Sequence, residues 1–319
     1  MRPLFWLGMN YLVTGATGFI GRRLIDRLLK DGHTVNYLAR RRPKNMDSRA
    51  AFFCWRENEE PPLDCIPALH AVVHLAGETV VQRWTAASKR RIGDSRVQLT
   101  YSLVNAIGKL TYKPSVLVSA SAIGYYGDRG SEIQTEHSAP GNGFLADLCV
   151  RWEAEATIAR QLGLRVVPIR LAVVLGAGGG ALKPLLPLFR AGLGGKLGNG
   201  SQWMSWIHVE DVVNLLIFAA TQENVQDVMN ASSPNPVRNF EFTRSLGQAV
   251  HRSAILPVPV PALRLVLGEV ADHIVASTRV VPEEALRRGF QFKYPTLESC
   301  LAAVVNAGDY TNISASMVS

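Results

Sequence analysis

The 319-residue sequence predicts an α/β fold, with a doubly wound parallel sheet and a smaller C-terminal α/β lobe. Short apolar runs that resemble buried strands alternate with segments of helical periodicity, as a parallel sheet requires. Apolar residues make up 47% of the chain and charged residues 19%, which provides a large core and excludes intrinsic disorder. The first apolar run also leads through a glycine-rich turn into a helix, so the sheet is predicted to be of the Rossmann type.

The first predicted strand covers residues 9–14 and runs into GATGFIG at 15–21, followed by apolar residues at helical spacing. Gly15, Gly18 and Gly21 allow a sharp turn, a close approach to a pyrophosphate and tight helix–strand packing. The helix N-terminus would face the phosphate charge. This pattern predicts a dinucleotide-binding turn, with a purely structural glycine turn as the alternative.

The second predicted strand covers residues 34–39 and ends where an NAD enzyme would place an acidic residue for the ribose 2′-hydroxyl. The sequence has Arg40, Arg41 and Arg42 there instead. Guanidinium groups suit a 2′-phosphate, because they form charge-assisted and often bidentate hydrogen bonds. The cofactor is therefore predicted to be NADP rather than NAD, and a solvated basic turn is the alternative.

Further strands are predicted at 71–78, 116–121 and 165–170, with a helix at about 144–162 before the last of them. This alternation places the loops after the strands at one edge of a parallel sheet. The small residues that end the strand at 71–78 would let a cofactor lie against the backbone.

These elements define an NADP-binding Rossmann domain at 9–175, with the sheet completed by a return at about 205–235. Residues 176–310 are assigned mainly to a substrate-side segment and the C-terminal lobe. Glycine is dense at 175–181 and 192–200, which predicts a flexible loop that could act as a lid over the substrate.

Several motifs in this order resemble the extended short-chain dehydrogenase/reductase superfamily. They are GATGFIG at 15–21, VHLAGE at 73–78, SASAIGYYG at 119–127 and WIHVEDV at 206–212. More narrowly, the chain resembles the atypical NAD-dependent epimerase/dehydratase-like branch, whose C-terminal module is seen at about 256–305. Members of this branch usually start near Met9, so residues 1–8 are expected to be an extension or a misassigned start.

The resemblance implies a set of cofactor contacts. These fall on Gly15, Thr17, Gly18, Phe19, Ile20, Gly21, Arg40, Leu75, Ala76, Glu78, Arg96 and Val174. An acid such as Glu78 beside a polyanionic cofactor costs free energy unless it bonds a ribose hydroxyl or pairs with an arginine such as Arg96. Asp211 is expected to cap a helix that begins at Val212.

The superfamily normally moves its proton through a tyrosine whose pKa is lowered by a lysine four residues on. This chain contains no Tyr-x-x-x-Lys. Counting back from Glu153, which resembles the glutamate after that motif, puts Cys149 at the lysine position and Leu145, next to Phe144, at the tyrosine position. Neither side chain can do this work, because a thiol is mostly uncharged at neutral pH and leucine has no transferable proton.

Replacement groups are predicted nearby. Ser121 is the expected hydroxyl, with Ser119 as the fallback, and Tyr125 is a candidate phenol with Arg129 four residues on as a cation. Packing beside the cofactor is the alternative for Tyr125. Cys149 is expected to be a buried, inert thiol. His74 is predicted to be a hydrogen-bonded core histidine, and His208 to be structural.

Charge, cysteine content and hydropathy argue against several classes of partner and site. The net charge of +8 could indicate an anionic ligand, but no helix-turn-helix or lysine stripe is present, so no nucleic acid is expected. Four scattered cysteines argue against a zinc site or disulfide scaffold and favour the cytoplasm, and no metal is predicted. The apolar stretches are shorter than the ~20 residues of a membrane span, so no membrane partner is expected.

Three functions remain open at this point. The first is an NADP(H)-binding, NADP-dependent oxidoreductase that acts on an unidentified small molecule. The second is a non-catalytic NADP(H)-binding regulatory protein that acts through a protein partner, and the third is a nucleotide-sugar epimerase. A homodimer is compatible with each of them.

Overall fold

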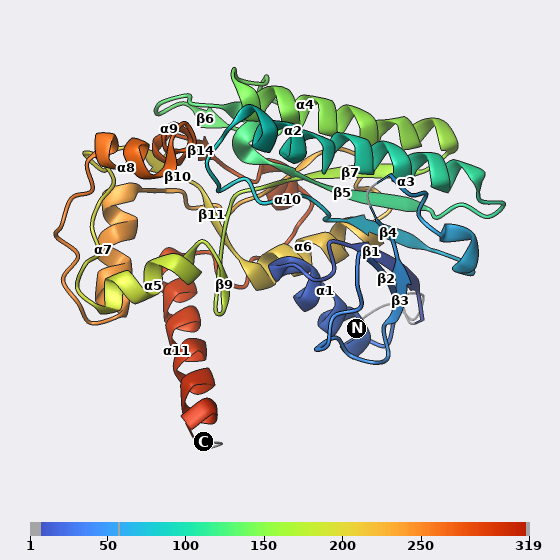
Figure 1. Cartoon of the computed structure of the whole chain (residues 1–319), viewed down its shortest axis with the longest axis horizontal. Helices are drawn as coiled ribbons and strands as arrows, with labels where there is room; N and C mark the ends of the chain where they lie inside the picture. The colour runs from blue at the N-terminus through green and yellow to red at the C-terminus, as the bar shows by residue number, and fades with distance from the viewer. Residues whose placement is uncertain (1–7, 57, 317–319) are drawn as a thin grey trace.

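The computed structural model describes residues 8–56 and 58–316, with side chains up to residue 306. Figure 1 shows a central sheet with helices on both faces and a lobe beside it that is formed largely by the second half of the chain. The predicted extension at residues 1–8 lies almost entirely outside the described residues. The α/β architecture with a smaller lobe is confirmed.

The central sheet has seven strands in the order β3-β2-β1-β4-β5-β7-β12. Every neighbouring pair is parallel. The strands are β1 (Asn10–Thr14), β2 (Thr34–Ala39), β3 (Ala51–Cys54), β4 (Ala71–His74), β5 (Val116–Ala122), β7 (Arg165–Leu171) and β12 (Met229–Ala231). The strand order reverses between β1 and β4, so the crevice at the carboxyl ends of these two strands is where a doubly wound sheet binds its ligand.

Both faces of the sheet are buried, because alternate residues of each strand point to opposite sides. Tyr11 and Val13 pack with α1 (Phe19–Lys30) and α6 (Val209–Thr221) on one face. Leu12 packs on the other face with α3 (Val97–Lys109). Figure 1 shows α3 lying beside α2 (Ala86–Asp94) and α4 (Phe144–Thr157) on this second face. These two apolar layers fix the sheet between its helices.

The predicted strands agree with the observed ones, apart from their ends. The strand expected at 71–78 stops at His74, so Leu75–Glu78 leaves the sheet as extended chain. The helix expected at 144–162 consists of α4 and a 3-10 turn, η4 (Ile158–Leu162). Two other 3-10 turns are η2 (Leu63–Cys65) and η3 (Ile123–Tyr126).

The lobe consists of short strands and helices. A three-stranded sheet has the order β11-β8-β9, and the two-stranded pairs are β10 with β13 and β14 with β6. These strands are β6 (Ile133–Gln134), β8 (Val173–Gly176), β9 (Gly179–Gly180), β10 (Trp203–Met204), β11 (Trp206–His208), β13 (Val237–Arg238) and β14 (Arg279–Val280). The helices are α5 (Leu182–Arg190), α7 (Asn239–Ala249), α8 (Val260–Leu267), α9 (Val270–Val275), α10 (Glu283–Arg287) and α11 (Leu297–Ser316). Within the described ranges, no helix combines the length and apolarity needed to span a membrane.

The prediction of a flexible loop at 175–181 is wrong. Leu175 pairs with Gly180 and Gly176 with Gly179, which makes an antiparallel hairpin of β8 and β9. A side chain at Gly179 would come within 1.9 Å of the Phe19 ring, so glycine here permits close packing rather than mobility. The following residues form α5, whose Leu182 and Phe189 are buried.

The prediction that Asp211 caps a helix beginning at Val212 is also wrong. Helix α6 begins at Val209, and the ring nitrogen Nδ1 of His208 accepts the hydrogen bond from the Glu210 backbone N–H. The buried Asp211 carboxylate instead accepts hydrogen bonds from the backbone N–H groups of Lys293 and Tyr294, at 2.7 and 3.0 Å. It therefore ties α6 to the segment before α11.

The turn from β1 into α1 brings two backbones into contact. Gly15 has φ of +67°, and a Cβ atom built on it would lie 2.5 Å from the carbonyl carbon of Leu75 at the end of β4. Only a residue without a side chain allows this approach in this left-handed conformation. The close contact holds β1 and β4 together where the crevice opens.

We predict that Gly15→Ala lowers the free energy of unfolding by about 1 to 3 kcal/mol, because the added methyl group overlaps the Leu75 backbone. Urea denaturation measures this change. Gly108→Ala in α3 is the control, because a Cβ atom there meets only Leu162 at an ordinary 3.6 Å. Equal stability of the Gly15→Ala variant and the unmodified protein would contradict the argument.

Candidate functional site

A cleft of about 870 Å³ lies at the carboxyl ends of β1, β2 and β4. Five of the predicted cofactor residues line it, namely Gly15, Thr17, Arg40, Ala76 and Glu78. Its wall also contains Thr14, Leu38, Ala39, Arg41, Trp55, Arg56, Asn58, Gly77, Ser95 and Leu99. The crevice between β1 and β4 is therefore part of a cavity of the size that small ligands occupy.

The remaining predicted cofactor residues lie around this cleft rather than on its wall. Ile20 and Leu75 pack against the apolar core under α1, and Gly21 is buried there. The Phe19 ring packs against the β8–β9 hairpin, to which Val174 belongs. These residues support the glycine turn and its hairpin, and they set the position of the cleft wall.

The glycine turn and three arginines form two sides of the cleft. Gly18 is the N-cap residue of α1, and the first turn of this helix contains no acidic residue. Across the cleft, the exposed Arg40 and Arg41 follow β2, and Arg56 follows β3. The N–H groups of a helix N-terminus and these guanidinium groups both favour an anionic ligand.

The segment after β3 is the part of the cleft wall that the sequence analysis missed. Trp55 is buried, and its indole N–H donates to the Glu59 carbonyl at 3.0 Å. The backbone N–H of Trp55 donates to the Ala39 carbonyl, which brings the segment beside the arginines. The short apolar run AFFC at 51–54 was the available signal for this edge strand.

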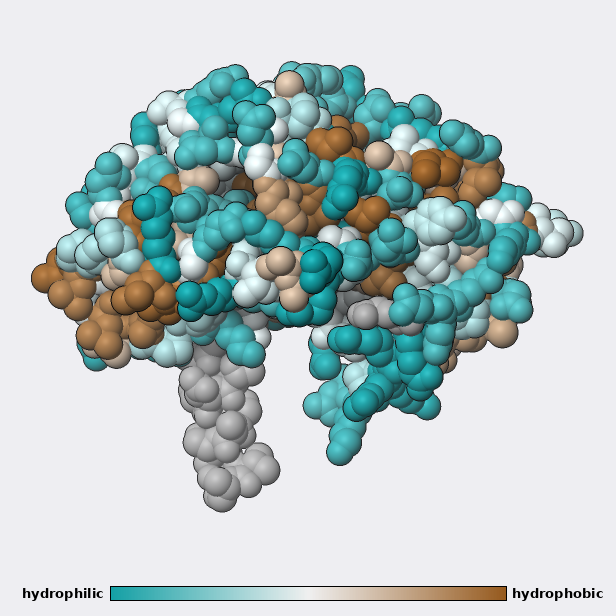
Figure 2. All heavy atoms as spheres, turned by 45° about the horizontal axis from the view of Figure 1, so that its top comes forward, coloured by the Kyte–Doolittle hydropathy of each residue, from teal (hydrophilic) through white to brown (hydrophobic). Residues whose placement is uncertain are grey.

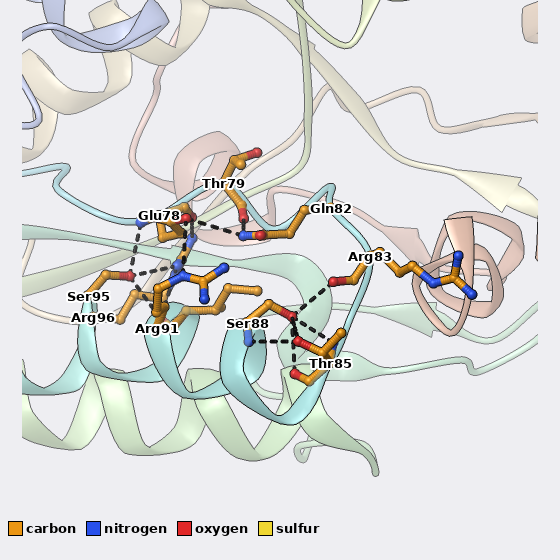
Figure 3. Close-up of polar contacts among 10 residues, drawn as sticks. Glu78, Thr79, Gln82, Arg83, Thr85, Ser88, Arg91, Ser95 and Arg96 are labelled. Carbon is orange, nitrogen blue, oxygen red and sulfur yellow. Dashed lines mark hydrogen bonds and ion pairs between the residues drawn. The ribbon is translucent and has the colours of Figure 1, made fainter. Parts of the chain in front are cut away.

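Of the two ways to offset the cost of Glu78 beside the cofactor, an ion pair with Arg96 is not the one that the structure contains. Arg96 donates from Nη2 to the backbone carbonyl of Glu78 at 2.9 Å, and Figure 3 shows it beneath the chain that leaves β4. The Glu78 carboxylate lies 4.0 Å from Arg91 and 3.4 Å from the Gln82 amide. Burial lowers the pKa of Arg96, although the negative charge of Glu78 opposes this. Arg96 therefore fixes the backbone of the cleft wall.

His74 is the predicted core histidine, and it links the cleft to α3. The Thr14 hydroxyl accepts hydrogen bonds from the N–H groups of Leu75 and Ala76, so its own hydrogen is left for Nδ1 of His74 at 2.7 Å. Nε2 then donates to Thr100 at 3.0 Å. Burial lowers the pKa of His74 to about 4, so the ring is neutral.

Ser121 lies at the end of β5 but is buried, and its hydroxyl donates to the Glu153 carboxylate at 2.6 Å. Arg170 forms a bidentate pair with the same carboxylate, at 2.9 and 2.8 Å. Burial acts against the charged form of Arg170, but the hydrogen bonds and charge of Glu153 outweigh it and raise the pKa of Arg170. Toward any ligand, Ser121 is therefore a hydrogen-bond acceptor.

The half-buried Tyr125 lies over this ion pair, with the Arg170 guanidinium carbon 3.4 Å from its ring centroid. Arg129 does not approach the Tyr125 phenol in the way the spacing suggested. Its guanidinium donates to the backbone carbonyls of Tyr126, Ala139 and Pro140. Arg129 therefore holds the loop after β5.

Cys149 is the buried thiol that the sequence predicts. Burial and the neighbouring charge of Glu153 raise its pKa to about 11, so it is neither a cation nor a thiolate. No group of three or more His, Cys, Asp or Glu in the part of the chain with described side chains is arranged to hold a metal ion.

Comparisons with known proteins agree with this geometry. The family model described as the NAD dependent epimerase/dehydratase family matches residues 11–232, and a domain of unknown function, DUF1731, matches residues 258–304. The chain is 40% identical over 304 residues to the epimerase family protein SDR39U1 homolog, chloroplastic, of Arabidopsis thaliana, covering 93% of this chain and 87% of that protein. It is 34% identical to the epimerase family protein YfhF of Bacillus subtilis, covering 93% and 98%.

Two solved structures are similar along most of the chain. Human epimerase family protein SDR39U1 (isoform 2), solved with NADPH, has a TM-score of 0.85 and 31% identity, covering 93% of this chain and 99% of that one. A nucleoside-diphosphate sugar epimerase from Corynebacterium glutamicum has a TM-score of 0.77 and 31% identity, covering 96% of this chain and 60% of that one.

The buried neutral His74 predicts a pH dependence of stability. Its pKa falls from an ordinary 6.5 to about 4 in the folded chain, so below pH 6.5 the unfolded chain binds a proton that the folded chain does not. Stability is therefore lost as the pH falls from 6.5 toward 4, by up to about 1.4 kcal/mol per pH unit through this residue.

Urea denaturation across this pH range measures the slope. We expect His74→Asn to flatten it, whereas His251→Asn, which removes an exposed histidine, leaves it unchanged. A slope that is the same in all three proteins would show that His74 does not cause the loss.

Proposed function

The chain belongs to the NAD dependent epimerase/dehydratase family, and from that premise we propose that it binds NADP(H) and transfers hydride between this cofactor and a small molecule. The observation that carries the proposal is that Arg40 and Arg41 line the same cleft as Gly15 and Thr17. One ligand can therefore contact the glycine turn and the two arginines together. NADP(H) presents a pyrophosphate and a 2′-phosphate at two separate points, as this arrangement requires.

The residues present fit this cofactor. The N-terminus of α1 offers N–H groups without an acid in its first turn, and Gly15 and Thr17 of the turn line the cleft. The two exposed arginines match a 2′-phosphate, for which guanidinium forks are well suited. Support also comes from the human SDR39U1 structure, which was solved with NADPH and is similar over 93% of this chain.

When bound, NADPH supplies a hydride, and the chain must orient the group that receives it. Ser121 and Tyr125 are the hydroxyl groups that we propose for this task, since Ser121 lies at the carboxyl end of β5 and Tyr125 lies in the turn that follows it. Because the Ser121 hydrogen is directed to Glu153, Ser121 would orient a ligand by accepting a hydrogen bond from it. Tyr125 would then be the group that exchanges a proton.

A second candidate is a regulatory NADP(H)-binding protein that acts through a protein partner. Leu145 and the neutral thiol Cys149 stand where the proton-transfer pair of the superfamily would be, which favours binding without chemistry. Figure 2 also shows apolar side chains gathered at the left end of the molecule, over the lobe. The exposed apolar residues of that part of the lobe are Ile255, Leu256, Leu265 and Val266. Contiguous exposed apolar surface commonly marks an interaction site.

A nucleotide-sugar epimerase is the least favoured of the three functions. Such an enzyme keeps its cofactor bound and depends on the same proton-transferring tyrosine, and leucine at position 145 cannot replace it.

The cofactor proposal predicts a difference between NADPH and NADH. We expect Arg40→Gln and Arg41→Gln each to weaken NADPH binding about tenfold or more, because a charged hydrogen bond is lost, and to change NADH binding little. Titration followed by nicotinamide fluorescence measures both affinities. Arg42→Gln is the matched control, since Arg42 belongs to the same run but does not line the cleft. Equal losses for NADPH and NADH would refute the assignment of the 2′-phosphate.

The hydride-transfer proposal predicts that NADPH is oxidised by at least one compound in a panel of aldehydes and ketones. Ser121→Ala and Tyr125→Phe should each slow that turnover at least tenfold, because the first removes the oxygen that orients the ligand and the second removes the phenol that exchanges a proton. Tyr101→Phe, which changes an exposed tyrosine, is the control. Tight NADPH binding with no oxidation of any compound would favour the regulatory candidate instead.

A further inference from the structure

One helix beside the cofactor cleft also contacts the C-terminal part of the chain. The segment that leaves β4 forms a loop at residues 79–84 and then enters α2, whose N-cap residue is Thr85. Glu78, just before the loop, and Ser95, just after α2, both line the cleft. We call residues 78–96 the α2 unit. Because this unit starts and ends at the cleft, its position sets part of the cleft wall.

Hydrogen bonds close the α2 unit at both ends of its helix. At the cleft end, the backbone N–H of Glu78 donates to the Ser95 hydroxyl at 2.9 Å, and Arg96 donates to the Glu78 carbonyl. At the other end, Thr85 and Ser88 form a capping box, with bonds of 2.7 and 3.1 Å between their hydroxyl and backbone groups. A displacement of α2 therefore carries Glu78 with it.

The loop of the α2 unit is bonded to itself. The Gln82 side-chain amide donates to the Thr79 carbonyl at 2.7 Å, and the Trp84 indole N–H donates to the Val80 carbonyl at 3.0 Å. Figure 3 shows Gln82 directed toward Glu78 and Thr79. The loop thus joins Trp84 to the cleft wall through short, direct contacts.

The far end of the α2 unit docks on the C-terminal segment, residues 258–304, which the domain of unknown function matches. The Lys89 ammonium forms an ion pair with the Glu269 carboxylate at 2.6 Å. The Trp84 ring stacks with the His273 ring, with centroids 6.3 Å apart and an angle of 27° between the planes. Both partners come from α9 or its N-cap residue.

Trp84 and Lys89 join this docking to a third element, α4. The Trp84 ring meets the ring of Phe144, the first residue of α4, edge to face with centroids 5.1 Å apart. The Lys89 ammonium lies 5.6 Å from the Trp84 ring and 5.3 Å from the Phe144 ring, within the range of cation–π attraction. These two side chains are therefore the centre of the contact between the α2 unit and the C-terminal segment.

The docking matters because little else holds α2 in place. Only Ser88, Ile92 and Gly93 of its nine residues are buried, so Ile92 supplies most of the apolar burial beneath the helix. Glu269 is half exposed, and exposed ion pairs are weak, so the contact can form and break at a small cost in free energy.

We propose that the C-terminal segment controls how tightly the cleft holds NADP(H), and that Trp84 and Lys89 are the positioning residues that couple the two. A docked segment keeps the α2 unit, and with it Glu78 and Ser95, in place on the cleft wall. Loss of the docking contacts frees the unit and opens the wall. Such coupling is reciprocal, so the bound cofactor must also stabilise the docked segment. The inference rests on the proposed function in taking NADP(H) as the ligand of the cleft.

The release rate of NADPH from the full-length chain tests this coupling. Excess NADP⁺ displaces bound NADPH, and directly excited nicotinamide fluorescence follows its loss. We expect Trp84→Ala to speed release about fivefold or more, and Lys89→Gln and Glu269→Gln each about twofold, because Trp84 makes the larger contact. The Lys89→Gln/Glu269→Gln double variant should be no faster than either single one, since both remove the same pair. Trp84→Phe should keep much of the slow rate.

Arg264→Gln is the matched control, because it breaks an exposed ion pair with Asp272 that lies within the C-terminal segment and does not reach the α2 unit. It should leave the release rate unchanged. Thermal unfolding of each variant shows whether it is folded.

Hydrogen exchange measures the reciprocal effect, which a merely structural role of Trp84 would not produce. NADPH should slow amide exchange at residues 268–276 in the unmodified chain and have no such effect in folded Trp84→Ala. Equal release rates from the unmodified chain, Trp84→Ala and Glu269→Gln, or exchange at 268–276 that NADPH does not change, would overturn the coupling alone. An unmodified chain that does not bind NADPH would overturn both the coupling and the proposed function.

Discussion

The position of the cleft depends on a close contact between the backbones of Gly15, after β1, and Leu75, after β4. Gly15 lies so close to the Leu75 carbonyl that no side chain fits between them. This contact fixes the distance between the chains that leave β1 and β4, and α1 begins at Phe19, directly after the glycine turn. Phe19, the first residue of that helix, then packs against the β8–β9 hairpin and so couples the turn to the lobe. A backbone contact of this kind cannot be replaced by other side chains elsewhere in the chain.

The buried pair of Glu153 and Arg170 joins α4 to β7 beside the end of β5. Separating such a pair leaves an uncompensated buried charge, so its members are fixed in position. Ser121 is bonded to this pair, Tyr125 stacks over it, and the Tyr126 hydroxyl accepts from Arg170 at 2.9 Å. The hydroxyl groups nearest the end of β5 are therefore part of a rigid polar framework rather than freely moving side chains.

Much of the fold follows from the sequence, because strands buried on both faces leave continuous apolar runs. The limits expected for β2 agree with the structure, and β1, β5 and β7 begin or end within one residue of their predicted limits. The hairpin at 173–180 and the position of Asp211 were not predictable locally. Glycines permit either mobility or close packing, and only the Phe19 ring, which is distant in sequence, decides between them. Asp211 likewise bonds backbone groups 82 residues or more away. Of the candidate site, the glycine turn and Arg40 were apparent from sequence, whereas the place of Trp55 in the cleft wall depends on its backbone contact with Ala39 at the end of β2.

The last strand of the central sheet has a consequence for how the chain is made. β12 pairs with β7, but about sixty residues of hairpin and helix separate the two strands. During synthesis from the N-terminus, β7 therefore waits as an open edge until residues 229–231 have left the ribosome. Unpaired edges of apolar strands recruit other chains, and parallel pairings between distant segments form slowly. The apolar β7 edge of a nascent chain is therefore exposed for as long as the ribosome takes to translate residues 172–228.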